Sequence, residues 1–544
     1  MKVYFNPVLK IIVGFIFVLN SCLGHAQIQN NENPVNVVLI ICDDLNDAIE
    51  GMGGHPQVIT PKIASLMEEG VCFTNAQTNS PICGPSRASM WSGLYPHTTG
   101  YYGYKQQSNH WRKNHVLKNT VTLFEQLVNN GYDVFATGKI HHNGHEDWSI
   151  FNNNDGQSGF KVGPSFGPYP WDGDPKTNNV HDRGVAHPDL PANYKSNSCW
   201  DSFGPIYDIS DKMGGKGTWL YNHDDIEFKY LDENNRDLMP DERCVEYTEE
   251  VLSKNYDKPF FMAVGFNRPH SPCYVPEKYF KKYPIDSLKL APYLENDLDD
   301  CSEIIWKDKD LGTGATGFHK YNVLNEAGGE KALLQWTQSY LASVSFIDEQ
   351  IGKVVDAVKN SKYANNTLII LTSDHGYHMG EKEYIFKNTL WEESARIPLI
   401  ISGLSSSKNK FCSTPVSLID IYPTIVDYCN LPTNPNVDGN KKPLDGHSLK
   451  PLINDPDKGK WEGNDFAITA VSSAAPLELD EPANSEEQHY SIRTERYRYI
   501  YCRNGEEELY DHKTDPYEWN NLAGNKRYSK IKEKLKDKII SICY

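Results

Sequence analysis

The stretch VNVVLIICDD, residues 35–44, is an apolar run that ends in two aspartates. Three further runs share this pattern and end in charged or imidazole side chains: YDVFATGKIHH (132–142), KPFFMAVGFNRPH (258–270) and NTLIILTSDHG (366–376). Uniformly apolar runs of this length are typical of strands buried on both faces. Because ligands bind outside the carboxyl ends of strands in open α/β sheets, we expect the four runs to assemble one site.

Helical patterns lie between these strands. PKIASLMEEG (61–70) opens with a proline in the first turn and ends at a glycine. In residues 339–360 apolar side chains recur at helical spacing just before the fourth strand, as expected of a crossover helix. The sequence therefore predicts an α/β fold with a large mixed, mostly parallel sheet flanked by helices.

The pattern changes after about residue 455. HYSIRTERYRYIYC (489–502) alternates as a strand does, and apolar residues recur at helical spacing near the C-terminus. We predict a larger domain over residues 27–455 and a smaller α+β subdomain, an antiparallel sheet plus a helix, over 456–544. Residues 151–235 are rich in Asn, Gly, Asp, Pro and aromatic residues, and we expect long loops there.

The N-terminus, residues 1–26, has the composition of a signal peptide. IIVGFIFVL (11–19) is an apolar core that follows Lys2 and Lys10 and is too short to span a membrane. Cleavage before Gln27 is the preferred interpretation, and a lipoprotein signal that ends before Cys22 is the alternative. We expect an exported protein, either periplasmic or, if Cys22 is lipidated, anchored to a membrane or at the cell surface.

Bulk composition narrows the class of partner. Lys and Arg total 54 and Asp and Glu total 72, so the formal net charge is −18. Such an acidic chain argues against nonspecific nucleic-acid binding, although a local basic pocket can still bind an anionic substrate. The 12 cysteines contain no C-x-x-C pair, so their spacing does not indicate a zinc site.

The residues at the strand ends supply metal-ligand chemistry. Asp43, Asp44, Asp374 and His375 combine three carboxylates with one imidazole. Hard oxygen ligands favour Ca²⁺ or Mg²⁺, and the single histidine leaves Mn²⁺ or Zn²⁺ open.

A basic set accompanies these acidic residues: Arg87, Lys139, His142, His270 and Lys387. Together they are typical of an anion-binding pocket with a proton donor. A metal beside several cations predicts a substrate such as a phosphate or sulfate ester.

NSPICGPSRASMWSG (79–93) surrounds Cys83 with a proline, a serine and an arginine. C-x-P-S-R resembles the signature of the sulfatase family. NRPHSP (267–272), TSDHGYHMGEK (372–382) and further blocks resemble the same family, in its order, from about residue 35 to 525. Within the family, GKIHHNG and GEKEYIFKNTLWEESARIPL are most similar to the iduronate-2-sulfatase branch. The resemblance makes 27–455 the expected catalytic domain.

The resemblance implies a modified nucleophile and a metal. Family members have the signature cysteine, here Cys83, oxidised to formylglycine (3-oxoalanine) by a maturation enzyme of the export pathway. Its aldehyde hydrate is then the expected nucleophile. Asp43, Asp44, Asp374 and His375 match the metal ligands, usually for one Ca²⁺ per chain, and residue 83 completes the shell.

The resemblance also implies roles for the basic set. Arg87 matches the arginine that steadies the hydrate, and Lys139 matches the lysine between nucleophile and sulfate. His270 matches the histidine that protonates the leaving alcohol, and Lys387 the lysine that binds the sulfate and ester oxygens. The common family spacing points to His141 as a further site residue, whereas the iduronate-type spacing points to His142, which we prefer.

We therefore expect an exported sulfatase that acts on a sulfated polysaccharide or oligosaccharide. Candidates are algal glycans such as ulvan or carrageenan, and glycosaminoglycans. One alternative is a phosphodiesterase or phosphonate monoester hydrolase of the same superfamily. Another, from a different class, is a glycan-binding protein without catalytic activity.

Overall fold

A computed structural model describes residues 34–544 except 104–110, 143–147, 152–158, 175–184, 192–193, 195–200, 222–225, 308–312, 405–406, 437–440, 476, 479–480 and 483. Residues 35–544 form one compact unit. The predicted signal peptide and Cys22 lie outside the described residues. None of the helices in the described part is long and apolar enough to cross a membrane.

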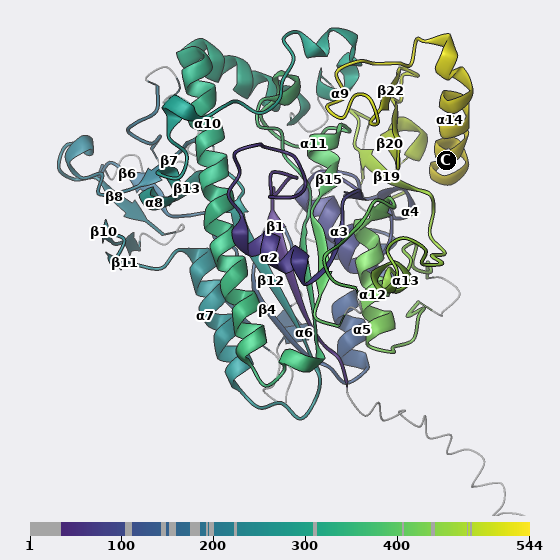
Figure 1. Cartoon of the computed structure of the whole chain (residues 1–544), viewed down its shortest axis with the longest axis horizontal. Helices are drawn as coiled ribbons and strands as arrows, with labels where there is room; N and C mark the ends of the chain where they lie inside the picture. The colour runs from purple at the N-terminus through teal and green to yellow at the C-terminus, as the bar shows by residue number, and fades with distance from the viewer. Residues whose placement is uncertain are drawn as a thin grey trace, which may run out of the picture. The chain divides into compact units, whose positions relative to one another are not determined.

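An eight-stranded sheet forms the centre of this unit (Figure 1). In spatial order its strands are β17 (Lys410–Cys412), β2 (Gly70–Phe73), β16 (Leu399–Ser402), β14 (Thr367–Ser373), β1 (Asn36–Asp43), β12 (Phe260–Pro269), β4 (Asp133–Gly138) and β5 (Gly159–Lys161). β1 pairs in parallel with both β12 and β14, and β4 pairs in parallel with β12 and β5. β16 pairs antiparallel with β14 and β2. The predicted mixed, mostly parallel sheet is confirmed.

Helices cover both faces of the sheet, which explains why β1 is apolar from Val37 to Cys42. Val38 and Ile40 belong to the core cluster on the side of α2 (Pro61–Glu68), α7 (Pro240–Ser253) and α10 (Thr313–Asn360). Val37, Leu39 and Ile41 belong to the cluster on the side of α3 (Cys83–Ser92), α5 (Leu123–Asn129) and α12 (Ile421–Tyr428). Successive strand residues point to opposite faces, so both sets must be apolar.

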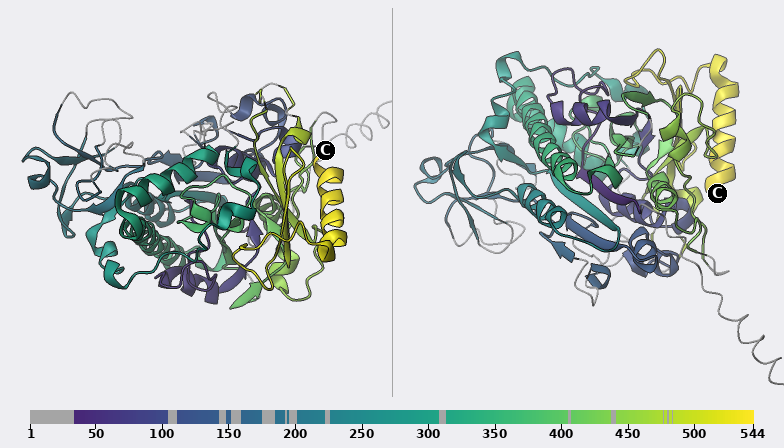
Figure 2. Two further views of the ribbon diagram at one scale, coloured as in Figure 1. Left: turned by 90° about the horizontal axis from the view of Figure 1, so that it is seen from above. Right: turned by 60° about the horizontal axis from the view of Figure 1, so that its bottom comes forward.

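The C-terminal part is also as predicted. β19 (Phe466–Val471), β20 (His489–Thr494), β21 (Tyr497–Tyr501) and β22 (Glu507–Asp511) form an antiparallel sheet in sequence order. α14 (Ser529–Cys543) runs alongside it (Figure 2), with Leu535 and Ile539 packed into the same core as Ile468 and Ile492. The boundary at residue 455 stays a prediction.

Residues 151–235 differ from the expectation of long loops alone. They contain the short strands β6 (Tyr169–Trp171), β7 (Phe203–Ile206), β8 (Thr218–Leu220), β9 (Glu227–Phe228), β10 (Tyr230–Asp232) and β11 (Asn235–Arg236). β6, β8 and β9 form one small sheet, β10 and β11 another, and β7 pairs with β13 (Cys273–Pro276). Figure 1 places these small sheets beside α10. Strands this short carry no readable period-2 pattern, so the sequence did not reveal them.

The remaining short elements connect these layers. They are β3 (Ala76–Gln77), β15 (Arg396–Ile397), β18 (Val416–Ser417), α4 (Pro96–Thr99), α6 (Trp148–Phe151), α8 (Glu277–Phe280), α9 (Glu303–Lys307), α11 (Glu392–Ala395) and α13 (Lys450–Asn454).

Candidate active site

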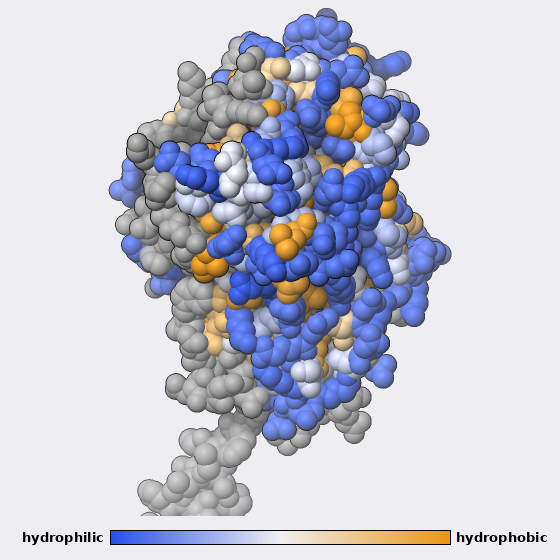
Figure 3. Space-filling model, turned by 90° about the vertical axis from the view of Figure 1, so that its left-hand side faces the viewer, coloured by the Kyte–Doolittle hydropathy of each residue, from blue (hydrophilic) through white to orange (hydrophobic). Residues whose placement is uncertain are grey.

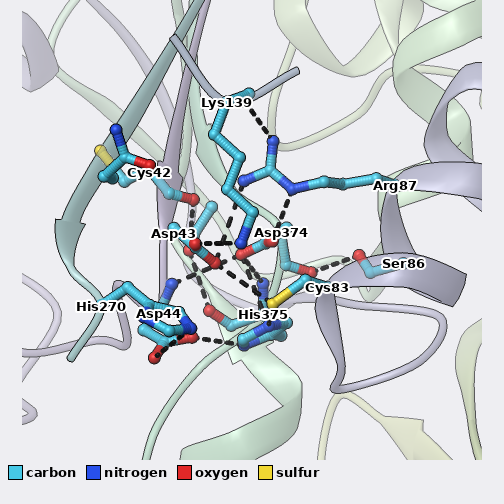
Figure 4. Close-up of polar contacts among 12 residues, drawn as sticks. Cys42, Asp43, Asp44, Cys83, Ser86, Arg87, Lys139, His270, Asp374 and His375 are labelled. Atoms are coloured by element: carbon cyan, nitrogen blue, oxygen red, sulfur yellow. Dashed lines mark hydrogen bonds and ion pairs between the residues drawn. The ribbon is translucent and has the colours of Figure 1, made fainter. Parts of the chain in front are cut away.

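The ends of β1, β12, β4 and β14 converge with the start of α3 (Figure 4). Asp43 ends β1, and Asp374 and His375 follow β14 directly. Lys139 follows β4 and His270 follows β12. The structure thus brings together the predicted polar side chains that follow all four strands.

Both aspartates of β1 reach the same cluster because the backbone turns between them. Successive side chains of a regular strand point to opposite faces. Asp44, however, has φ of 68°, a left-handed conformation that aspartate tolerates better than most residues. Its amide lies 3.4 Å from Asp374 Oδ1. The turn therefore ends the alternation and lets both carboxylates face the cluster.

Cys83 lies among these acidic residues. Its Sγ is 3.4 Å from Asp43 Oδ1 and 3.2 Å from His375 Nε2. His375 Nδ1 is 3.0 Å from the Gly376 carbonyl, which can only accept, so Nδ1 carries a proton and Nε2 faces the site. Asp43, Cys83, Asp374 and His375 each offer a ligand atom, and these atoms lie within 4.8 Å of one another.

Helix α3 positions Cys83 and Arg87. Cys83 is its first residue, and Pro85 occupies the first turn, where its missing N–H costs nothing. Arg87, one turn further along the buried helix, donates from Nε to Asp374 Oδ2 at 2.8 Å and from NH1 to the Lys139 carbonyl at 2.5 Å. The guanidinium therefore links α3 to two strand ends.

Two buried lysines from distant parts of the chain reach the cluster. The Lys139 ammonium bonds to Asp43 Oδ2, and the Lys387 ammonium bonds to Asp44 Oδ1. Lys387 Nζ also lies 3.3 Å from Cys83 Sγ. Gly138 and Gly265 allow the backbones of β4 and β12 to approach each other closely next to Lys139. A Cβ on Gly138 would lie 1.9 Å from the Gly265 carbonyl oxygen.

These cations change the chemistry of residue 83. Burial opposes ionisation of the Cys83 thiol, but Lys139, Lys387 and His375 outweigh it and hold its pKa well below the ordinary value. Burial also raises the pKa of Asp374 to about 6, despite the opposing charge of Arg87. The site therefore favours negative charge at position 83.

The two candidate histidines after Lys139 have different surroundings. The His141 ring is stacked on Trp111 at 5.1 Å and lies 6.0 Å from both Trp91 and Phe124. Burial and Lys139 lower the pKa of His142 overall, although Cys83 acts to raise it. The choice of His142 over His141 as a site residue stays a prediction.

His270 lies at the edge of the cluster. Its side chain is 15% exposed, and Nε2 is 3.9 Å from Asp44 Oδ2. Nδ1 donates to the Ser271 carbonyl at 2.5 Å, which fixes the ring and directs Nε2 towards the site. A group with this access can exchange a proton with a substrate atom.

Several residues beside the site were not among the predicted site residues. The Phe166 ring lies 4.8 Å from His270 and 5.1 Å from Lys139 Nζ. Arg268 holds this segment by donating to the carbonyls of Phe166 and Gly167, at 2.9 and 3.2 Å. Thr78 and Ser86 donate to the Asp374 carbonyl. Phe166 comes from a stretch without periodicity, so only the fold could place it there.

The donor set fits a divalent metal. Asp44 Oδ2 is buried and accepts no hydrogen bond from the residues that the structure describes. Two overlapping groups of side chains could hold a cation: Asp43, Asp44, Cys83 and His270, and Asp43, Cys83, Asp374 and His375. The three carboxylates of these groups suit a hard cation. Asp43, Asp44, Asp374 and His375 are therefore a candidate divalent-metal site.

Comparisons with known proteins agree with this geometry. A family model described as Sulfatase matches residues 35–431. A second model, described as the C-terminal part of N-sulphoglucosamine sulphohydrolase, matches residues 380–543.

Curated relatives cover most of the chain. A sulfatase of Formosa agariphila is 33% identical, over 94% of this chain and 87% of the relative. An ulvan-active sulfatase of the same organism is 26% identical, over 96% of this chain and 84% of the relative. Human iduronate 2-sulfatase is 28% identical, over 69% of this chain and 61% of its own.

Solved structures share the fold. A 2-O GAG sulfatase has a TM-score of 0.63 at 21% identity, with 93% of this chain and 92% of the other covered. The phosphonate monoester hydrolase of Agrobacterium radiobacter has a TM-score of 0.62 at 20% identity, with 93% and 95% covered.

Proposed function

We propose that this chain, which belongs to the sulfatase family and is a sulfuric ester hydrolase, removes sulfate from a sulfated glycan. The proposed nucleophile is an oxidised residue 83. One observation carries the proposal. Cys83 Sγ, at the start of α3, lies within 3.4 Å of Asp43, His375 and Lys387 together. Sγ marks the place where the oxygens of formylglycine would lie after conversion.

The nucleophile is regenerated in each turnover. A maturation enzyme, with an oxidant such as molecular oxygen, oxidises Cβ of Cys83 by two electrons; the C–S bond breaks, the sulfur leaves as sulfide, and an aldehyde forms. Water then adds to the aldehyde to give a hydrate with two hydroxyls. One hydroxyl oxygen attacks sulfur, and the bond between sulfur and the ester oxygen breaks. The second hydroxyl then loses its proton, the aldehyde re-forms, and sulfate leaves. A simple alcohol at position 83 would instead remain esterified.

The chain's own cations balance the charge of the sulfate. Lys139 and Lys387 bond to the carboxylates next to residue 83. Arg87 donates hydrogen bonds to Asp374 and to the Lys139 carbonyl, so it positions the groups that surround the nucleophile. His270 donates a proton from Nε2 to the leaving alcohol, and this nitrogen lies 3.9 Å from Asp44 Oδ2.

We propose Ca²⁺ as the metal, one per chain, held by Asp43, Asp44, Asp374 and His375. The oxygen-rich ligand set supports this choice. When bound, the ion withdraws charge from the sulfate and orients the nucleophile.

A sulfated polysaccharide or oligosaccharide is the proposed substrate. The ulvan-active relative, human iduronate 2-sulfatase and the GAG sulfatase of similar fold support this class. Ulvan, carrageenan and glycosaminoglycans are the candidates. The signal sequence of residues 1–26 supports export to the periplasm, with a lipid anchor on Cys22 as the alternative.

Mass spectrometry and one variant test the nucleophile. After co-expression with a maturation enzyme, residue 83 should be about 18 Da lighter than cysteine. Cys83→Ala should lower sulfate release by at least about 10⁴-fold and leave the melting temperature unchanged. Cys301→Ser, a cysteine near Tyr510, is the matched control and should retain activity. Retained turnover in Cys83→Ala would contradict the proposed nucleophile.

Two rival activities are separated by substrate choice. The fold shared with a phosphonate monoester hydrolase makes phosphate and phosphonate esters the first rival class. Faster hydrolysis of an aryl phosphate diester than of an aryl sulfate by the oxidised protein would favour that rival. Glycan binding without sulfate release, despite complete oxidation of residue 83, would favour a non-catalytic glycan-binding protein.

A further inference from the structure

A second cavity of about 530 Å³ lies among the small sheets. Trp171 on β6, Thr218 on β8, Phe228 on β9 and Leu231 on β10 line it, together with the loop 208–217. Its volume is in the range of small-molecule pockets. None of the candidate catalytic or metal residues lines it.

The apolar part of this cavity offers flat surfaces. Trp171 is half-buried, Phe228 is buried, and Leu231 at the rim is 56% exposed. Figure 3 looks onto the side where Figure 1 places β6, β8, β10 and β11, and it shows hydrophobic residues scattered among hydrophilic ones. Aromatic side chains of this kind supply a large apolar contact surface.

The polar part of the cavity carries balanced charge. Two carboxylates, Asp208 and Glu227, face two ammonium groups, Lys216 and Lys229. Ser210 donates to Asp208 at 2.6 Å, Thr218 donates to Glu227 at 3.1 Å, and Lys229 donates to Asn235 at 2.8 Å. Such a lining offers donors and acceptors without a net positive field, so it suits hydroxyl groups better than sulfate groups.

The cavity is joined to the catalytic cluster by one short segment. Phe166 contacts His270, and Trp171 is five residues further along the chain. Five extended residues span at most about 18 Å, so the backbone beside His270 and the backbone that carries Trp171 lie within a length comparable to a short oligosaccharide. Arg268 holds the Phe166 end of this segment by hydrogen bonds to two carbonyls.

We infer that this cavity binds an unsulfated sugar unit of the same glycan whose sulfated unit occupies the catalytic cluster. The inference rests on the proposed function. One face of the sugar packs against Trp171 and Leu231, and its hydroxyls bond to the polar side of the cavity. Because the two sites lie on one chain, binding at the cavity raises the effective concentration of the sulfate ester at the cluster.

Two variants test the cavity. The substrate is whichever of ulvan, heparin and chondroitin sulfate the oxidised wild-type protein desulfates. Trp171→Ala should raise KM for this polymer by about tenfold with little change in kcat, because an aromatic contact of about 1.4 kcal/mol is lost. Leu231→Asn, at an exposed position that tolerates change, should raise KM by about threefold. Neither variant should alter hydrolysis of an aryl sulfate, which is too small to reach both sites.

A competitor and a control separate the possible failures. Chemically desulfated oligosaccharides of the same polymer should inhibit polymer turnover but not aryl sulfate turnover, and Trp171→Ala should abolish this inhibition. Tyr517→Ala, an exposed aromatic residue elsewhere, should behave as wild type. An unchanged polymer KM in both cavity variants would overturn the inference. Absence of sulfate release from every ester by the oxidised wild type would instead overturn the proposed function.

Discussion

Two buried clusters in this protein combine carboxylates with a histidine, and they differ in how the charges are paired. The first, the catalytic cluster, contains Asp43, Asp44, Cys83, Asp374 and His375 with the cations Arg87, Lys139 and Lys387. The second, the arginine cluster, contains Glu392, Glu518, His512, Arg493 and Arg498. Among the described residues, four side chains of the first cluster and three of the second lie close enough together to share a metal ion.

Guanidinium groups neutralise the arginine cluster. Arg498 forms ion pairs with Glu392 and, at 2.7 Å, with Glu518. Arg493 donates to both carboxylate oxygens of Glu392, at 3.1 and 3.2 Å. Burial opposes ionisation of Glu392, but Arg493, His512 and Arg498 hold its pKa well below the ordinary value. This cluster joins α11 to the C-terminal sheet, and its function is structural.

The catalytic cluster is paired differently. Its two lysines are point donors, which can move from one acceptor to another more readily than a planar guanidinium held by two bonds. Asp44 Oδ2 accepts no hydrogen bond from the described residues, and His270 remains partly exposed. Buried carboxylates alone therefore do not identify a reactive site. The combination found here does: a carboxylate oxygen that accepts no hydrogen bond from the described residues, Asp44 Oδ2, beside an accessible histidine, His270.

The largest expected effect concerns Asp44. Asp44→Asn keeps the size of the side chain but removes its charge, so it should lower kcat/KM for an aryl sulfate by about 10³-fold. The buried Lys387 ammonium keeps an amide oxygen as its acceptor but loses a charged partner, so the protein should fold with a lowered melting temperature. Metal content per chain, measured on the purified protein, should fall in parallel. Full metal content and full activity in this variant would show that Asp44 is not a ligand.

The second effect falls on stability. Arg498→Met leaves Glu392 and Glu518 buried with fewer partners and should lower the free energy of unfolding by about 3–5 kcal/mol. Activity per folded molecule should be retained. Arg496→Met is the matched control. Arg496 lies two residues before Arg498 and is largely exposed where it pairs with Asp511. Urea unfolding of both variants measures the contrast, and equal stabilities would refute a structural role for Arg498.

The sequence was sufficient for the parts of this molecule that depend on periodicity and strand ends. The uniformly apolar β1 and β14 predicted a doubly covered parallel sheet, and the polar residues after them do lie together. The short strands between residues 169 and 236 were missed because two to four residues show no period. Tertiary pairing, rather than local sequence, makes them strands.

Side-chain environments were less predictable than side-chain positions. The sequence left His141 and His142 as alternatives. In the structure the His141 ring is stacked on Trp111, whereas Cys83 is among the groups that act on the pKa of His142. Phe166 and Arg268 reach the site through contacts between segments about a hundred residues apart. No spacing rule in the sequence predicts such contacts.

His270, at the edge of the catalytic cluster, and His512 of the arginine cluster differ in their access to substrate. His512 Nε2 lies 2.9 Å from Glu518, within the arginine cluster, whereas His270 Nε2 is 3.9 Å from Asp44 and accessible to substrate. If His270 protonates the leaving alcohol, His270→Ala should slow hydrolysis of alkyl or sugar sulfates by about 10²-fold, because these alcohols leave poorly without a proton. Aryl sulfates with acidic leaving groups need no such help and should lose little. His512→Ala should alter stability but not this ratio, so equal losses on both ester classes in His270→Ala would remove His270 as the acid.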